Sequence, residues 1–151
     1  GHAAKCFVPL RAAATPSAVM SVPERFWTFT GLGPGERPLP VCGAFAGTPA
    51  ALDALATEDG PEAWVERIAA LRPDLELDPA GAFVATWRDD PWVHGAYSAA
   101  SPRTPREDHD AWLAGAGPLV FAGEHTAGGW AALMEGALRS GIRAARDVAG
   151  R

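Results

Sequence analysis

A single carboxylate beside a glycine-rich turn is the first feature of this sequence that could bind a cofactor. Glu124 follows an apolar run at residues 118–122, and Gly128 and Gly129 precede a helical pattern over residues 130–148. The start of a helix offers unpaired N–H groups and a partial positive charge. Together with Glu124, it could hold a cofactor that has hydroxyls and an electron-rich ring edge. The alternative is an ordinary strand-to-helix crossover with Glu124 in solvent.

Lys5 is the only lysine among 13 cationic residues. A lysine amine buried near a polarised cofactor can hold a water molecule and tune proton transfer. On an exposed strand it would have no chemical role, and both interpretations remain open at this point.

Other common catalytic patterns are missing from the sequence. The histidines form no i, i+4 pair and no HExxH motif, which predicts that the chain has no metal site; they are His2, His94, His109 and His125. The sequence contains no GxSxG motif, so it gives no support for a hydrolase. The GLGPG segment at residues 31–35 has its third glycine one position early for a dinucleotide-binding loop, and Pro34 and Pro38 prevent the helix that such a loop needs. It is therefore predicted to be a turn.

Strands dominate the predicted elements of the first half. Residues 1–10 alternate Ala4, Cys6 and Val8 with Lys5, Phe7 and Pro9, as a short strand does. The runs 26–30 and 39–46 flank the glycine turn, which predicts a hairpin. A helix is expected up to residue 71, with Thr57 as a cap and Pro61 in its first turn. A further strand is expected over residues 81–87.

The second half is predicted to contain a long loop and one strand–helix unit. Residues 88–117 are loop-rich, and the charged segment 103–110 is expected to be solvated surface. Residues 118–122 are predicted as a short buried strand and residues 130–148 as a long helix. Its apolar residues form one stripe, while Arg139, Arg143 and Arg146 occupy other faces. The stripe consists of Met134, Leu138, Gly141/Ile142, Ala145 and Val148.

Composition and charge narrow the function classes. The chain has 151 residues, of which 48% are hydrophobic and 21% charged, a composition typical of globular proteins. Its formal net charge of −5 argues against binding to nucleic acid or anionic lipid as the main function. No apolar run approaches the length of a membrane span, and Cys6 and Cys42 have no CxxC spacing. We expect a cytoplasmic protein.

Three segments resemble, in the same order, the C-terminal part of the flavin-dependent amine oxidases, a family that includes monoamine, polyamine and L-amino-acid oxidases and flavin-type histone lysine demethylases. GHAAK at residues 1–5 resembles the family's GxxxK strand. WRDDPWVHGAYS at residues 87–98 resembles its W-x-x-DP-x-x-x-G-x-Y-S segment. FAGEHT at residues 121–126, followed by MEGALRSGIRAA at residues 134–145, resembles its FAGE-x-T turn and following helix.

The resemblance implies roles for individual residues. Lys5 matches the lysine that holds a water molecule facing flavin N5, and Tyr97 matches one wall of the aromatic cage that steers the amine. Ala96 stands where some monoamine oxidases carry a cysteine linked to FAD, which implies non-covalent FAD here. Glu124 and its neighbours would contact the ribityl-pyrophosphate region, and the N–H of Met134 would point at flavin O2, where reduced flavin carries negative charge.

Further positions follow from the same resemblance or depart from it. Gly123, Trp92 and Leu133 complete the set of cofactor-binding residues that it implies. The second cage aromatic aligns with Leu133, so the cage is half-built, and Trp130 one turn earlier either replaces that aromatic or simply packs.

The resemblance also implies a fold and a missing unit. We expect a mixed α/β chain in which residues 1–116 hold part of an antiparallel-sheet substrate domain with linking segments. Residues 117–151 would supply the C-terminal strand and helix of a Rossmann-like FAD domain. The family's N-terminal unit with its GxGxxG motif is not in this chain, which therefore resembles a fragment: a cloned domain, a proteolytic piece or one subunit of a split enzyme. Its partners would be the unit carrying GxGxxG and a small amine or amino acid.

The expected function is oxidation of a C–N bond to an imine, with dioxygen reduced to hydrogen peroxide, in an assembly that this chain completes. One alternative keeps the fold and changes the substrate, as in carotenoid desaturases or porphyrinogen oxidases; Lys5 and Tyr97 argue against it. Another alternative is a non-catalytic α/β interaction domain. A stable monomer without an exposed apolar patch would support it. A large exposed patch near residues 121–134 would instead indicate a missing partner.

Overall fold

The computed structural model of the chain describes residues 2–99, 103 and 111–150, in two compact units. The first unit is Gly1–Ala96 and the second is Tyr97–Arg151. Gly1 of the GHAAK segment, His109 and nearly all of the charged segment 103–110 lie outside the described residues. Within those residues, no helix is long and apolar enough to cross a membrane.

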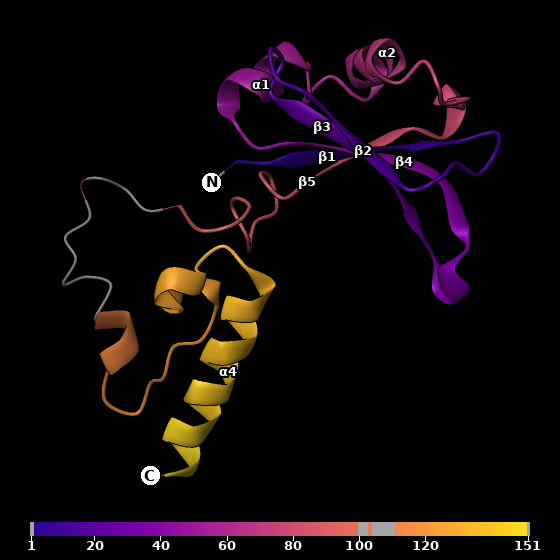
Figure 1. Cartoon of the computed structure of the whole chain (residues 1–151). Coiled ribbons are helices and arrows are strands. Elements are labelled where there is room, and N and C mark those ends of the chain that lie inside the picture. The colour runs from indigo at the N-terminus through magenta and orange to yellow at the C-terminus, as the bar shows by residue number, and fades with distance from the viewer. Residues whose placement is uncertain (1, 100–102, 104–110, 151) are drawn as a thin grey trace. The chain divides into compact units, whose positions relative to one another are not determined.

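The first unit is built on a five-stranded antiparallel sheet with the order β2-β3-β4-β1-β5 (Figure 1). Its strands are β1 (Ala4–Pro9), β2 (Ser17–Ser21), β3 (Phe26–Leu32), β4 (Pro38–Ala46) and β5 (Phe83–Thr86). The predicted first strand and hairpin are therefore confirmed. The glycine turn between β3 and β4 is the short 3-10 segment η1 (Pro34–Glu36), in which Gly35 has a φ of 69°. This turn reverses the chain, as the sequence predicted.

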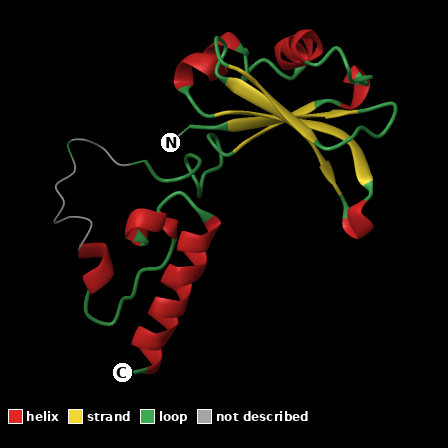
Figure 2. Ribbon diagram, viewed as in Figure 1, coloured by secondary structure: helices red, strands yellow, loops and turns green. Residues whose placement is uncertain are grey.

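Strand alternation gives the sheet one face covered by helices and one face without them. Helices α1 (Pro49–Ala54) and α2 (Glu62–Leu71) lie on the same side of the sheet (Figure 2). Trp64 of α2 is fully buried and packs edge-on against Phe26 of β3 at a ring separation of 6.2 Å. The buried core unites both layers and comprises Ala4, Cys6, Val8, Leu10, Phe26, Cys42, Ala44, Ala46, Ala51, Leu55, Trp64 and Ile68. Burial of these apolar side chains is the main source of stability in this unit.

A buried arginine fastens the end of α2 to the sheet. Arg72 is only 2% exposed, and its guanidinium makes two bonds to Asp74, at 2.9 and 2.8 Å. It also donates to Ser17 Oγ of β2 at 2.9 Å and makes a longer contact of 3.5 Å with Thr28 Oγ1 of β3. The ion pair holds the pKa of Asp74 below its usual range, chiefly through the hydrogen bond from Arg72. The buried guanidinium at the edge of the core therefore has the hydrogen-bond partners that buried polar groups need.

Besides helical residues 111–114, which fall in the segment predicted as loop, the described part of the second unit contains two short 3-10 segments followed by one long helix. These are η3 (Glu124–Thr126), η4 (Gly128–Trp130) and α4 (Met134–Ala149). The helix begins four residues later than predicted, because residues 128–130 form the 3-10 turn and Leu133 has an extended conformation. The apolar stripe of α4 is open to solvent: Met134 is 87% exposed and Leu138 is 65% exposed.

The strand predicted at residues 118–122 does not form. This segment has only an isolated bridge between Ala116 and Leu119. An apolar strand of this kind needs a neighbouring strand in a sheet. All five described strands belong to the sheet of the first unit, so the apolar run has no strand to pair with in the described part of the second.

Two elements of the first unit were not predicted, and one capping residue has a different role. Strand β2 lies in a stretch rich in proline and alanine, where pairing with β3 overrides weak local preference. Helix α1 is capped by Thr48, whose hydroxyl accepts from the N–H of Ala51 at 3.3 Å. Thr57 does not cap α2; instead it accepts a bond from the indole of Trp64 at 3.1 Å. The strand predicted at 81–87 is confirmed as β5, preceded by the 3-10 segment η2 (Pro79–Gly81).

Candidate functional site

The carboxylate of Glu124 is fixed by three short hydrogen bonds within the second unit. The N–H of Ser98 donates to Oε1 at 2.6 Å, and the Ser98 hydroxyl donates to Oε2 at 2.5 Å. The N–H of Ala132, two residues before α4, also donates to Oε2, at 2.6 Å. Glu124 therefore joins the end of the 87–98 segment to the start of the helix, and it does not extend freely into solvent.

These donors keep Glu124 ionised. Desolvation alone would raise the pKa of this carboxyl, but the hydrogen bonds from Ser98 and Ala132 and the nearby His125 outweigh it. The net effect lowers the pKa of Glu124 below its ordinary value of 4.5. A fixed negative charge that accepts further hydrogen bonds suits a ligand rich in hydroxyl groups.

The Glu124 turn, defined as residues 121–126, has a conformation that only glycine allows at its centre. Gly123 has a φ of 142°, and a Cβ there would lie 2.5 Å from the ring of His125. Its N–H donates to Ser140 Oγ of α4 at 2.9 Å. The buried Thr126 donates back to the carbonyl of Gly123, also at 2.9 Å. The turn therefore packs directly on α4.

The first turn of α4 retains hydrogen-bond donors. Leu133 occupies the cap position with an extended backbone, and no side chain caps the helix. Helix α4 has 16 residues, so its aligned peptide dipoles give this end a partial positive charge. Met134 is the first helical residue and Leu133 is 50% exposed. The uncapped start of α4 therefore lies beside the anionic carboxylate of Glu124.

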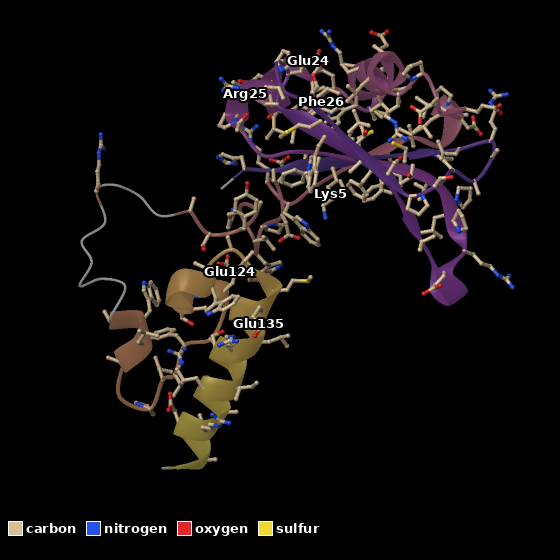
Figure 3. All side chains as sticks on the ribbon, in the orientation of Figure 1. Lys5, Glu24, Arg25, Phe26, Glu124 and Glu135 are labelled. Carbon is tan, nitrogen blue, oxygen red and sulfur yellow. The ribbon has the colours of Figure 1, made fainter. Side chains whose placement is uncertain are left out.

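In the first unit, Lys5 lies on the face of the sheet opposite α1 and α2, which no described helix of that unit covers. Figure 3 shows Lys5 on that side and Phe26 on the helix side. Its neighbours across β4 and β5 are Phe45 and Ala85. The strand register places only apolar residues and Lys5 on this uncovered face: Ala18, Met20, Trp27, Phe29, Val41, Gly43, Phe45, Phe7, Pro9, Phe83 and Ala85. Lys5 is exposed and is the sole charged group among them.

Aromatic contacts organise this uncovered face. Trp27 meets Phe45 edge-on at 6.0 Å, and Phe7 stacks on Phe83 at 5.3 Å. Trp27 remains 44% exposed and Phe83 55% exposed. An apolar surface of this extent around one ammonium group is a candidate site for an apolar ligand or for another part of the protein.

A cavity of about 900 Å³ opens beside β5 in the same unit. Its lining includes Phe83 and Val84 of β5 and the acidic residues Asp53, Asp59 and Asp89. Arg88 in this cavity pairs with Glu58. Ala96 lines the cavity as well, whereas Trp92 is 91% exposed and its N–H donates to Asp90 Oδ1 at 2.8 Å.

The structure brings some of the predicted site residues together. Gly123, Glu124, Leu133 and Met134 cluster in the second unit, and Tyr97, 38% exposed, immediately precedes the Ser98 that binds Glu124. Lys5, Trp92 and Ala96 belong to the first unit. Trp130 stacks against Arg139, with the guanidinium carbon 4.5 Å from the ring centre.

Three residues that shape this site were not predicted to belong to it. Ser98 was part of a family-like segment, but its bond to Glu124 spans 26 residues and has no local signal. Ser140 and Arg143 contact the Glu124 turn from α4. Their polar character at helix positions three apart, on one face, is the signal that could have identified them.

Known proteins with similar sequences give the family context. The family described as flavin containing amine oxidoreductase matches residues 7–149. A Drosophila melanogaster protein named "Possible lysine-specific histone demethylase 1" is 37% identical over 82 residues, covering 47% of this chain and 9% of the relative. The L-amino-acid oxidase of Mus musculus is 44% identical over 66 residues, covering 41% of this chain and 10% of that enzyme.

A solved structure has the same fold. Cyclohexylamine oxidase from Brevibacterium oxydans IH-35A aligns with a TM-score of 0.77 at 21% identity, covering 99% of this chain and 35% of that one. The chain thus spans about a third of that structure and about a tenth of the two curated relatives. Because the family match extends over nearly the whole sequence, this chain belongs to the flavin-containing amine oxidoreductases.

Proposed function

We propose that this chain is the C-terminal part of an FAD-dependent amine oxidase that converts an amine or amino acid to an imine. Two electrons and two protons leave the C–N unit of the substrate, dioxygen accepts them to form hydrogen peroxide, and water hydrolyses the imine. A polypeptide segment carrying a GxGxxG unit, on the same or a second chain, would complete the FAD site. The need for a further segment is consistent with the length of this chain, which covers about a third of the related solved structure.

The observation that carries the proposal is the fixed Glu124 carboxylate beside the uncapped start of α4. Its acceptor oxygens suit the ribityl hydroxyls of FAD, and the N–H groups of the first helical turn suit the flavin edge that becomes negative on reduction. The residues present therefore fit a non-covalently held flavin, which supplies the two-electron chemistry when bound. Ala96, where some relatives have a linking cysteine, cannot form a thioether.

The chain's own residues would handle the substrate and its protons. Lys5 would hold a water molecule at the reacting nitrogen of the cofactor, and the aromatic residues of the uncovered sheet face would exclude bulk water around the amine. Tyr97 would provide one wall of the amine cage. With Leu133 at the second wall and Trp130 stacked on Arg139, the cage has a single aromatic side from the predicted positions.

We place the enzyme in the cytoplasm. Cys6 and Cys42 are both free thiols, as expected where the glutathione pool keeps cysteine reduced.

The test is to produce the chain together with the segment that carries the GxGxxG unit, purify the complex and record its visible spectrum, intact mass and peroxide release with amines. We expect flavin absorption bands, a flavin that leaves the protein on denaturation, and amine-dependent peroxide. A colourless complex without turnover would refute the proposal. It would favour a non-catalytic α/β interaction domain instead.

A Lys5→Met variant of the same complex tests the assigned lysine. Lys5 is exposed on β1, so its replacement should not disturb the core, yet peroxide turnover should fall by about tenfold or more, the range typical of a lost proton-transfer group. Arg37→Met, at the exposed turn between β3 and β4, is the matched control and should retain full turnover. Full turnover of Lys5→Met would shift the assignment toward another flavoprotein chemistry.

A further inference from the structure

The Glu124 turn has little internal support. Residues 121–126 lie in no strand, and the 3-10 segment η3 within them is only three residues long. Gly123 adds a left-handed φ of 142°, which leaves the peptide more conformational freedom in the absence of other contacts. Its geometry must therefore be imposed from outside the turn.

Two polar side chains of α4 impose it. Ser140 is 3% exposed; its hydroxyl accepts from the N–H of Gly123 and donates to the carbonyl of Ala137, both at 2.9 Å. Arg143 Nη2 donates to the carbonyl of Phe121 at 2.6 Å and to Thr126 Oγ1 at 3.1 Å. Ser140 thus holds the middle of the turn and Arg143 holds its two ends.

The burial of Arg143 costs free energy, so a contribution to stability does not explain why this residue stands here. Its Nε and Nη1 atoms are buried, and neither has a hydrogen-bond partner within the described residues. Buried unpaired donors are unfavourable, and an apolar side chain of similar size is often at least as stabilising as a buried charge. The two bonds of Nη2 are the contribution that an apolar replacement would lose.

The Glu124 carboxylate has a separate set of bonds, to Ser98 and Ala132. No hydrogen bond joins Arg143 or Ser140 to that carboxylate among the contacts of the described residues; their bonds go to the main chain and the Thr126 hydroxyl of the turn. Any effect of Arg143 on Glu124 must therefore act through the geometry of the turn.

We propose that Ser140 and Arg143 are positioning residues that hold the Glu124 turn in the conformation that binds flavin. This inference rests on the proposed function. It assigns to α4 a second task besides its N-terminal amides: the helix fixes, from beneath, the carboxylate and main chain that lie beside its own start.

The experiment compares Arg143→Met and Ser140→Ala with Arg146→Met, an exposed arginine on the same helix. In the chain itself, amide exchange of Gly123 and Thr126 and the NMR titration of Glu124 are measured. In the flavin-containing complex, the flavin dissociation constant is measured. We expect Arg143→Met to speed exchange in the turn, to raise the pKa of Glu124 and to weaken flavin binding by about tenfold or more, the loss typical of a charge-assisted bond. Arg146→Met should change none of these.

The outcomes separate this inference from the proposed function. A coloured wild-type complex with unchanged flavin affinity in both Arg143→Met and Ser140→Ala overturns the inference and leaves the oxidase proposal intact. A loosened turn with unaltered flavin affinity also overturns it, because the role would then be structural only. A colourless wild-type complex overturns the proposed function itself.

Discussion

Arg72 illustrates how one residue can tie distant parts of the first unit together. It belongs to the C-terminal end of α2, yet it bonds to Ser17 of β2 and contacts Thr28 of β3. We expect Arg72→Met to lower the free energy of unfolding by about 2 kcal/mol, because it removes the charge-assisted hydrogen bonds of a buried guanidinium to Ser17 and Asp74. Denaturant unfolding followed by tryptophan fluorescence measures this change.

The matched control for Arg72 is on the same helix. Arg67 is 54% exposed and pairs with Glu24, which is 35% exposed. Exposed ion pairs contribute little, so Arg67→Met should alter the free energy of unfolding by no more than about 0.5 kcal/mol. Equal effects of the two substitutions would show that the hydrogen bonds of the buried Arg72 stabilise the fold no more than an exposed ion pair does.

Glu124 gives the second unit a defined pH dependence. Its pKa is lower in the folded chain than the ordinary value of 4.5, so ionised Glu124 stabilises the fold fully above about pH 4.5. This contribution is lost as the pH falls through the lowered pKa and the carboxylate becomes protonated. Thermal unfolding between pH 7 and pH 3 should show a stability gap between wild type and Glu124→Gln that closes on acidification. Glu135→Gln, an exposed residue paired with Arg139, should give a much smaller gap at pH 7.

At the scale of elements, α4 has one glycine position without room for a side chain and another that borders open space. A Cβ at Gly136 would lie 2.1 Å from the carbonyl oxygen of Trp130, whereas a Cβ at Gly141 would meet nothing within 4 Å. Gly136→Ala should therefore force the helix away from η4 and cost about 1–3 kcal/mol. Gly141→Ala should stabilise the helix by up to about 1 kcal/mol. Thermal unfolding of the second unit compares the two; equal midpoints would contradict the close approach at Gly136.

The elements also show how far the sequence alone could predict the fold. Alternation predicted β1, and the paired apolar runs around the glycine turn predicted the β3–β4 hairpin, because those patterns are local. Strand β2 was not predicted, because its strand conformation depends on pairing with β3 and its own residues have little strand preference. The apolar run at 118–122 was assigned as a strand from its composition, but a strand forms only where a neighbouring strand pairs with it.

The candidate site was only partly predictable for the same reason. Glu124 stood out because a carboxylate follows an apolar run and precedes a glycine-rich turn and a helix, whereas Gly123 was implied by the family resemblance. Ser98, Ser140 and Arg143 did not, since their bonds to the turn connect residues 17 to 26 positions apart. Such contacts follow from the packing of the whole second unit and have no short sequence signature.

At the scale of the whole molecule, the proposed function implies that the segment carrying GxGxxG docks on the exposed apolar stripe of α4. Leu138 is 65% exposed and Ile142 is 53% exposed. Leu138→Glu together with Ile142→Glu should leave the chain's own stability nearly unchanged, because these side chains already face solvent. The same change should prevent assembly with the segment carrying GxGxxG and so abolish flavin retention. Gel filtration and flavin absorbance measure this.

Arg146→Glu on another face of α4 controls for the added negative charge, and it should leave assembly intact. If the stripe variant assembles and turns yellow like wild type, another surface must contact the missing segment.

The placement of the sulfur atoms determines which residues the hydrogen peroxide of the proposed reaction would oxidise. Cys6 and Cys42 are buried beneath the helices, and burial raises the pKa of Cys6 to about 12, so neither thiol forms the reactive thiolate at neutral pH. Met20 and Met134, by contrast, are 62% and 87% exposed. Oxidative damage from peroxide would therefore fall on the thioethers, as sulfoxides that methionine sulfoxide reductases can repair, and it would spare the irreversible sulfinic and sulfonic acids of cysteine.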